Sequence, residues 1–175
     1  MKKIFKYIFA GMAAMSVVAC SEDALETSPS SSVSGNELLG TATNALVSLN
    51  GVYRAMYTAG VSNSSNTHQC FGITAYNLVA DVMGEDCIMN GQGSGWFWYD
   101  CVYNVKSRYT STGWRSYDMW NGYYTWISNV NYILAEEETM SGSETEKNYV
   151  LGQAYAVRAY SYFMLAQMFS RTYKG

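Results

Sequence analysis

Apolar residues recur at steps of three and four in four segments of this chain, which is the spacing of one face of an α-helix. Ser34 and Glu37 form an S-x-x-E capping box, so a first helix is predicted to begin there and to end near Gly60. Its predicted apolar face consists of Leu38, Ala42, Ala45, Leu46, Leu49, Val52, Tyr53 and Met56. A second helix is predicted over residues 70–83, where Gly84 stops it. Its predicted face consists of Ile73, Tyr76, Asn77, Ala80 and Met83.

Two longer helices are predicted in the second half of the chain. The third covers about residues 116–136. Its predicted stripe consists of Trp120, Tyr124, Ile127, Asn131 and Leu134. Ser143 and Glu146 form another capping box, which starts a fourth helix over about residues 145–171. Beyond its first turn this helix carries Arg158 as its only charge up to residue 169, so we expect it to be buried on several sides.

These elements predict an all-α fold of antiparallel helical hairpins. Ala159-x3-Phe163 and Trp120-x2-Tyr123 give the last hairpin a tetratricopeptide-like character. Residues 84–113 lack a helical period and form a predicted long loop rich in glycine and aromatic residues, of a kind that is usually functional. Two hairpins are fewer than the three repeats that a solenoid needs, so the helical domain is expected to be incomplete.

The amino-terminal segment predicts export. Residues 1–19 contain three lysines, then an apolar run too short for a spanning helix of roughly 20 residues, then the small Ala19, and we interpret them as a signal peptide. Cys20 resembles the lipobox cysteine of bacterial lipoproteins, which implies an acylated thiol; a cysteine placed there by chance is the alternative. The Ser-rich residues 20–35 are predicted to be a flexible tether, and residues 36–175 the helical domain.

Charge and cysteine content exclude several functions. Without the three lysines of the predicted signal peptide, eight basic residues face 14 acidic ones, a net charge of about −6. Nucleic acid is therefore not an expected partner, because it requires a basic surface. One histidine and three cysteines without CxxC spacing do not predict a metal site, and no cofactor is expected. Export permits a disulfide among Cys70, Cys87 and Cys101, although buried free thiols are the favoured interpretation.

The order of motifs along the chain resembles the amino-terminal part of SusD/RagB-type nutrient-binding lipoproteins of Bacteroidetes. After Cys20 come NALVSLNGVY at 44–53, DVMGED at 81–86, WNGYYTWISNVNYIL at 120–134 and GQAYAVRAYSYFML at 152–165. The last motif is the most specific, and Gln153 departs from the glutamate common at that place in the family. Family members are several hundred residues long, so we expect this chain to be a fragment or a truncated gene product.

The resemblance implies a surface lipoprotein that presents glycans, or in some relatives peptides, to a TonB-dependent SusC-like transporter of the outer membrane. It implies a binding protein and no catalysis. The acidic pair Glu22-Asp23 behind Cys20 resembles a surface-export signal, although a solvated tether explains it equally well. A structural adaptor that binds no ligand is the alternative function.

Sugar recognition requires flat apolar surfaces together with planar polar groups, and the predicted loop supplies both kinds of side chain. The candidate ligand-binding residues are Trp96, Trp98, Tyr99, Asn90, Asp86 and Gln92. We expect Trp96 or Trp98 to stack on a sugar, whereas packing of both into the interior is the competing interpretation. Trp114, Trp120 and Trp126 are assigned to the core or to an interface.

Two polar residues in the apolar helices are expected to be structural. Arg158 requires a partner, because an unpaired buried charge costs several kcal/mol, and Asp81 or Glu85 is its expected partner. Asn131 is expected to bond to backbone across a helix interface. The lone His68 and the run of glutamates at 136–138 are weak grounds for an enzyme.

Overall fold

The computed structural model describes residues 38–63, 65–84, 87–102 and 110–171 of the chain. The chain divides into two compact units, Met1–Gly35 and Asn36–Gly175, and all the described residues belong to the second. The predictions about the signal peptide, Cys20, the tether and the Ser34–Glu37 capping box lie outside the described residues, as do Glu85 and Asp86.

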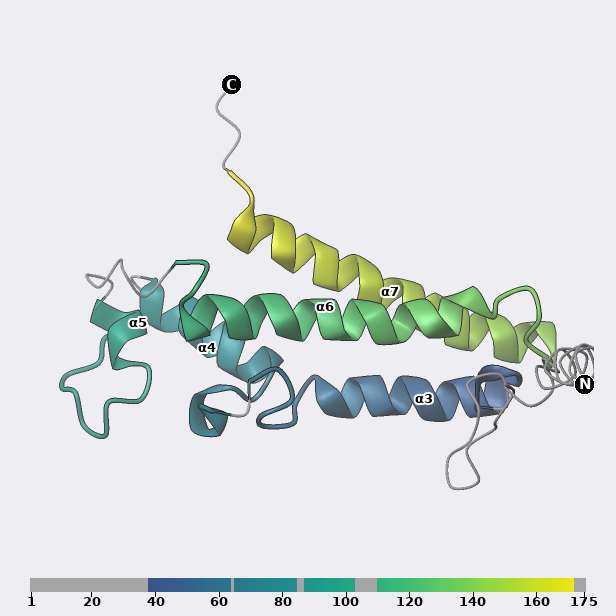
Figure 1. Cartoon of the computed structure of the whole chain (residues 1–175), viewed down its shortest axis with the longest axis horizontal. Helices are drawn as coiled ribbons and strands as arrows, with labels where there is room; N and C mark the ends of the chain where they lie inside the picture. The colour runs from purple at the N-terminus through teal and green to yellow at the C-terminus, as the bar shows by residue number, and fades with distance from the viewer. Residues whose placement is uncertain (1–37, 64, 85–86, 103–109, 172–175) are drawn as a thin grey trace, which may run out of the picture. The chain divides into compact units, whose positions relative to one another are not determined.

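The described part of the chain is all-α, as predicted, and contains no β-strand (Figure 1). Its elements are α3 (Ala42–Ala55), η2 (Thr67–Gln69), α4 (Ile73–Met83), α5 (Trp98–Val102), α6 (Trp114–Ala135) and α7 (Glu144–Phe169). The helices α6 and α7 form an antiparallel hairpin, and α3 packs against both of them. Among the described residues, no helix combines the length and hydropathy that crossing a bilayer requires.

The core lies where α3, α4, α6 and α7 face one another. Its largest fully buried apolar and aromatic side chains are Trp126, Tyr76, Tyr123, Leu49, Ile133, Val130 and Val150. The rings of Tyr76, Tyr123 and Trp126 pack together with centroids 5.0–5.9 Å apart, at tilted or edge-on angles that aromatic pairs prefer. Gly122 makes room for Tyr76, since a Cβ at this glycine would lie 2.2 Å from the Tyr76 hydroxyl.

The first predicted helix is interrupted. Leu38 and Leu39 are helical, but Gly40 and Thr41 are not, and α3 begins at Ala42. Thr41 caps the new start by accepting a hydrogen bond from the amide of Asn44. Ser141 donates its amide to the Gly40 carbonyl and accepts the Ala42 amide, so tertiary hydrogen bonds replace those of a continuous helix.

The second helix begins at Ile73 rather than at residue 70, because Gly72 adopts a positive φ of 69°. A Cβ at Gly72 would lie 1.9 Å from the Met56 carbonyl oxygen, which accepts the Ile73 amide. The predicted face was only partly correct, since Tyr76 is buried but Asn77 and Ala80 are exposed. The other buried residues of α4 are Ala75, Val79 and Val82.

The stripe predicted for the third helix is rotated relative to the observed core face. Trp120, Tyr124 and Asn131 are exposed, whereas Ile127 and Leu134 are buried. The remaining buried apolar and aromatic residues of α6 are Met119, Tyr123, Trp126, Val130 and Ile133. The rotation arises because aromatic residues surround α6 on most sides, so its periodicity does not mark one face.

The fourth helix begins as predicted, with Ser143 and Glu146 forming the capping box. The expectation that α7 is buried on several sides is wrong for the described residues. One side packs on α3 and α6, and the other exposes a row of large side chains. These exposed residues are Tyr149, Tyr155, Tyr162, Phe163 and Phe169.

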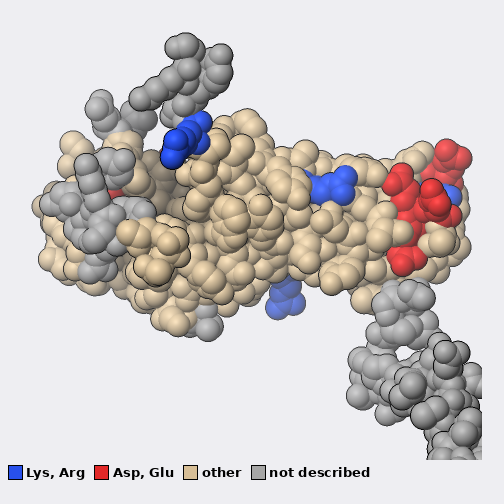
Figure 2. Space-filling model, turned by 45° about the horizontal axis from the view of Figure 1, so that its top comes forward, with Lys and Arg blue, Asp and Glu red and all other residues tan. Residues whose placement is uncertain are grey.

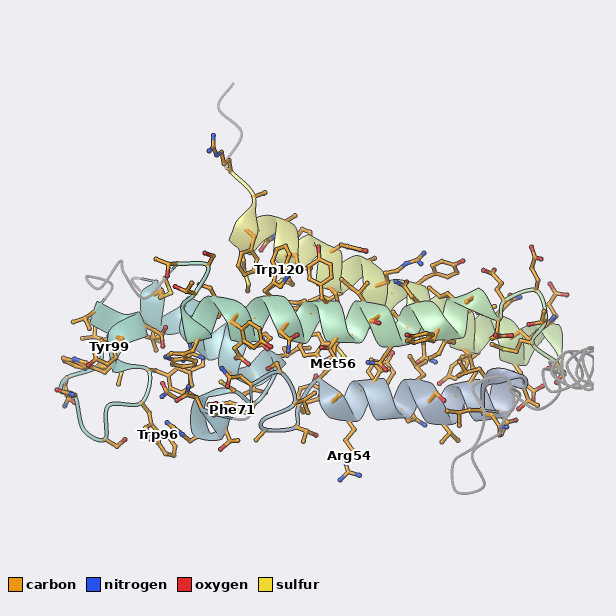
Figure 3. All side chains as sticks on the ribbon, viewed as in Figure 1. Arg54, Met56, Phe71, Trp96, Tyr99 and Trp120 are labelled. Carbon is orange, nitrogen blue, oxygen red and sulfur yellow. The ribbon has the colours of Figure 1, made fainter. Side chains whose placement is uncertain are left out.

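Charges are unevenly distributed over the unit. Acidic side chains gather at the end where α6 joins α7, and most of the remaining visible surface carries no charge (Figure 2). The sequence around that turn contains Glu136, Glu137, Glu138, Glu144 and Glu146. The aromatic loop residues lie at the opposite end of the unit (Figure 3).

Candidate ligand-binding site

The predicted aromatic loop places its aromatic side chains around the start of the short helix α5. Trp96 is 51% exposed and Tyr99 is 39% exposed, whereas Trp98 is half-buried. The side chains of Trp96 and Tyr99 lie at the same end of the unit (Figure 3). We call Trp96 and Tyr99 the aromatic platform. The expectation that α5 would be irregular chain was wrong, because glycines on its amino-terminal side concealed a single helical turn.

The backbone conformation of Phe97 explains why Trp96 faces outward. It is the one described non-glycine residue with a positive φ, 57°, and its side chain is buried against Phe71. Its amide donates to the side-chain oxygen of Gln69 over 2.8 Å. With Phe97 turned inward, Trp96 projects to the surface and packs against His68, with the two ring centroids 5.0 Å apart.

Arg115 holds this region together from the first turn of α6. It is only 3% exposed and forms an ion pair with the buried Asp100 of α5, with 2.9 Å between Nη2 and Oδ2. Its Nε donates to the other Asp100 oxygen over 3.3 Å, and its Nη1 donates to the Gln69 carbonyl over 2.8 Å. The guanidinium also lies 4.3 Å from the ring centre of Trp114, a cation–π distance. This pair could not be predicted from the sequence, because neither residue stands in a motif.

A small pocket opens beside this ion pair, with a volume of about 150 Å³. It is lined by Asn66, Gln69, Gly95, Tyr99, Asp100, Trp114 and Arg115. The lining thus combines two aromatic rings with amide, carboxylate and guanidinium groups. This combination suits a polar ligand with some apolar faces.

The other candidate residues lie apart from the pocket lining or outside the described chain. Asn90 and Gln92 are exposed on the chain that precedes the platform, and Asp86 is not described. Asn66, Gln69 and His68 were missed, because they fall in a Ser/Asn-rich loop without periodicity. Within the described chain, no group of three His, Cys, Asp or Glu residues could hold a metal ion.

A second hollow lies between α4, the start of α6 and the end of α7, with a volume of about 380 Å³. Its lining is mostly apolar and includes Val79, Met83, Met119, Met168 and Phe169. A neighbouring hollow of about 350 Å³ is bordered by Trp120 and Phe169. Few polar groups face either hollow, so they offer less to a sugar than the pocket beside Arg115 does.

A buried polar network fastens the loop before α4 to α6. Ser62 donates to one carboxylate oxygen of the fully buried Asp118, and the Tyr76 hydroxyl donates to the Asp118 carbonyl over 2.9 Å. Burial raises the pKa of the Asp118 carboxyl by more than its hydrogen bonds with Ser62 and Cys70 lower it. Burial likewise raises the pKa of the Cys70 thiol to about 12, so Cys70 remains protonated and unreactive.

The three described cysteines, Cys70, Cys87 and Cys101, are free. The favoured interpretation, a buried free thiol, holds for Cys70, whereas Cys87 is exposed.

Of the two expected partners of Arg158, Asp81 is not the one observed, and Glu85 lies outside the described residues. Arg158 donates to the Asn131 side chain over 3.1 Å and lies over the ring of Tyr155, whereas Asp81 is exposed on α4. Arg158 and Asn131 therefore join α6 to α7 near solvent. Asn131 bonds across this helix interface, but to the Arg158 side chain and not to backbone as expected. The buried arginine is Arg115, at a position where the sequence shows no long apolar helix around it.

Comparison with known proteins gives one match. Residues 89–174 match the SusD-like family described as starch-binding, associating with the outer membrane. Neither a search of curated proteins nor a search of solved structures finds a significant match. Over these residues the chain is a member of the SusD-like family, in agreement with the resemblance of its motifs. The matched region contains the aromatic platform, α5, α6 and α7.

Proposed function

We propose that this protein is a non-catalytic, outer-membrane-associated lipoprotein that binds glycans through the aromatic platform and the adjoining pocket. The observation that carries the proposal is that Trp96 and Tyr99 are exposed within the family-matched region and that Tyr99 lines a polar pocket. An aromatic ring offers an apolar face to the CH groups of a sugar, and the pocket offers planar hydrogen-bonding groups to its hydroxyls.

The proposal extends to delivery of the bound glycan to a TonB-dependent SusC-like transporter. The family description, starch-binding and associated with the outer membrane, supports it. The proposed anchor is a lipid on Cys20, behind a signal peptide at 1–19 and a tether at 20–35, with the helical domain following from residue 36. Metabolic labelling with a palmitate analogue tests the anchor: label should enter the protein, and Cys20→Ala should abolish it and release the protein from membranes.

Affinity electrophoresis against a panel of polysaccharides tests glycan binding. We expect retention by at least one neutral glycan, and we expect Trp96→Ala and Tyr99→Ala each to weaken it by about tenfold, the scale of one lost aromatic contact. Trp120→Ala is the matched control, because Trp120 is 46% exposed but lies on α6 away from the pocket. Retention that is unchanged in the platform variants, or lost equally in the control, would contradict the assigned site.

A structural adaptor is the second candidate, and the exposed row of large side chains on α7 favours it. Phe163 is 59% exposed and Tyr149 is 62% exposed, although both lie on a helix whose opposite side is core. Large exposed apolar surfaces commonly mark contacts with other proteins. If no glycan retains the protein while Phe163→Ser abolishes its copurification with the SusC-like transporter, the adaptor function replaces glycan binding.

A further inference from the structure

Three segments that are distant in the sequence meet at the side chain of Arg115. The loop before α4 contributes Gln69, the short helix α5 contributes Asp100, and Arg115 itself stands in the first turn of α6. Both charged side chains are buried, with 4% of the Arg115 side chain and 6% of the Asp100 side chain exposed. The pair is therefore shielded from solvent and from salt, unlike most surface ion pairs.

The geometry uses the planar fork of a guanidinium. Nε and Nη2 face the two oxygens of Asp100 at 3.3 and 2.9 Å, while Nη1 reaches the Gln69 carbonyl at 2.8 Å and Nη2 also lies 3.4 Å from the Gln69 side-chain oxygen. A lysine offers one point charge and cannot make this set of bonds. The same Gln69 oxygen accepts the Phe97 amide, so the fork is connected to the residue that turns inward.

Each residue of the aromatic platform is followed in the chain by a residue that these contacts hold in place. Phe97 follows Trp96 directly, and Asp100 follows Tyr99 directly, so each platform residue is one peptide bond from a residue tied to Arg115 or to Gln69. The positive φ of Phe97 is an unfavourable backbone conformation for a side chain of this size, and it persists only where the surroundings enforce it.

We propose that Arg115 is a positioning residue for ligand binding: by joining Asp100 to Gln69 it fixes the rings of the aromatic platform, Trp96 and Tyr99, at this end of the unit. This inference rests on the proposed glycan-binding function. Arg115 acts through the platform, since its donors are directed at Asp100 and Gln69. Its effect should therefore be local to this end of the unit, because the core of α3, α6 and α7 packs without it.

The test separates positioning from stability by changing both members of the ion pair. Removing one partner of a buried pair leaves an uncompensated charge, whereas replacing both by apolar side chains of similar volume is often neutral. The variant Arg115→Met with Asp100→Leu should therefore melt close to the wild type. It still lacks the fork that reaches Gln69, so we expect its affinity for the retained glycan to fall by about tenfold or more.

A signal that needs no ligand accompanies the affinity measurement. The near-UV circular dichroism of Trp96, obtained by subtracting the spectrum of Trp96→Phe, reports how firmly that indole is held. In the double variant this contribution should shrink to less than half. Arg115→Lys is the second variant: it keeps the charge opposite Asp100 but loses the fork, and should show the same losses in smaller measure. Arg54→Met is the control, since Arg54 is exposed on α3 (Figure 3).

The outcomes are distinct. If the double variant recovers stability, glycan affinity and the Trp96 signal together, Arg115 is only structural and the inference is wrong. If the double variant fails to fold, Arg115→Lys decides, and wild-type affinity with a wild-type Trp96 signal overturns the inference. If the wild type binds no glycan, the proposed function fails, while loss of the Trp96 signal in the variants still supports positioning.

Discussion

At the end of the unit where α6 joins α7, the structure depends on a solvent-exposed helix cap and on backbone hydrogen bonds, whereas the opposite end depends on buried polar side chains. The first end has the Ser143–Glu146 capping box and the backbone bonds of Ser141 with Gly40 and Ala42. The second has the buried pair of Arg115 and Asp100 and the network around Asp118. The comparison teaches that the candidate ligand site occupies the end whose order depends on buried polar groups, where single changes should have the largest effects.

The largest expected effect is that of Arg115→Met at the platform end. Leaving Asp100 buried without its cation should lower the free energy of unfolding by about 3–5 kcal/mol. Urea denaturation followed by far-UV circular dichroism measures it. The control Arg54→Met should stay within about 0.5 kcal/mol of the wild type, because Arg54 is exposed. Equal effects of the two variants would mean that the ion pair contributes no special stability.

Gly122→Ala should have the next largest effect, because it forces a methyl group against a fixed ring. The new Cβ would lie 2.2 Å from the Tyr76 hydroxyl, which is fully buried and hydrogen-bonded. We expect a loss of about 1–3 kcal/mol. Gly152→Ala on α7 is the matched control, since nothing lies within 4 Å of its added Cβ. That variant should gain up to about 1 kcal/mol from helix propensity, so opposite signs are expected in one thermal-denaturation series.

The pH dependence of stability should have opposite signs at the two ends. The pKa of Asp118 is raised by burial, so the folded state holds a proton that the unfolded chain releases. Its contribution is fully present below the unfolded pKa and is lost as pH rises through the folded pKa. The variant Asp118→Asn should remove this fall in stability with rising pH. Unfolding free energies measured from pH 3 upward would contradict the assignment if both proteins show the same slope there.

At the α6–α7 end, the hydrogen bonds from Ser143 lower the pKa of Glu146. The stability that this carboxylate contributes is present above its unfolded pKa and is lost as pH falls through the folded pKa. Ser143→Ala removes the side-chain bond but keeps the backbone one, so it should reduce that acid-side loss and cost about 1 kcal/mol at neutral pH, the smallest of the four effects. Lys147→Ala, in the same first turns of α7, is a control that keeps the cap. A Ser143→Ala variant as costly as Arg115→Met would remove the contrast between the ends.

Several elements could be predicted from the sequence because their signals are local. The capping box of α7, the stop of α4 at Gly84 and the existence of the four helices follow from spacing and from residues three apart. Of the two interpretations of the aromatic loop, packing of both Trp96 and Trp98 into the interior does not hold, since Trp96 is 51% exposed, whereas stacking on a sugar stays a prediction.

Other features had no local signal. The break before α3 exists because Ser141, a hundred residues away, bonds to Gly40 and Ala42. The core face of α6 could not be chosen from a helix with aromatic residues on most sides. Arg158 was expected to be a buried cation because its neighbours in sequence are apolar. Burial, however, depends on neighbours in space. Arg158 lies beside Asn131 and solvent, whereas Arg115 lies beside the buried Asp100.

Periodicity, caps and motif spacing act over one or two helical turns, so the all-α class, the family motifs and the aromatic composition of the candidate site can be predicted from the residues alone. Packing of distant segments is needed before Phe97 turns inward, Trp96 and Tyr99 face outward, and Arg115 joins Gln69 to Asp100. The physical reason is that a buried charge and a strained backbone are stabilised only by partners from other segments, and their positions emerge when the helices pack.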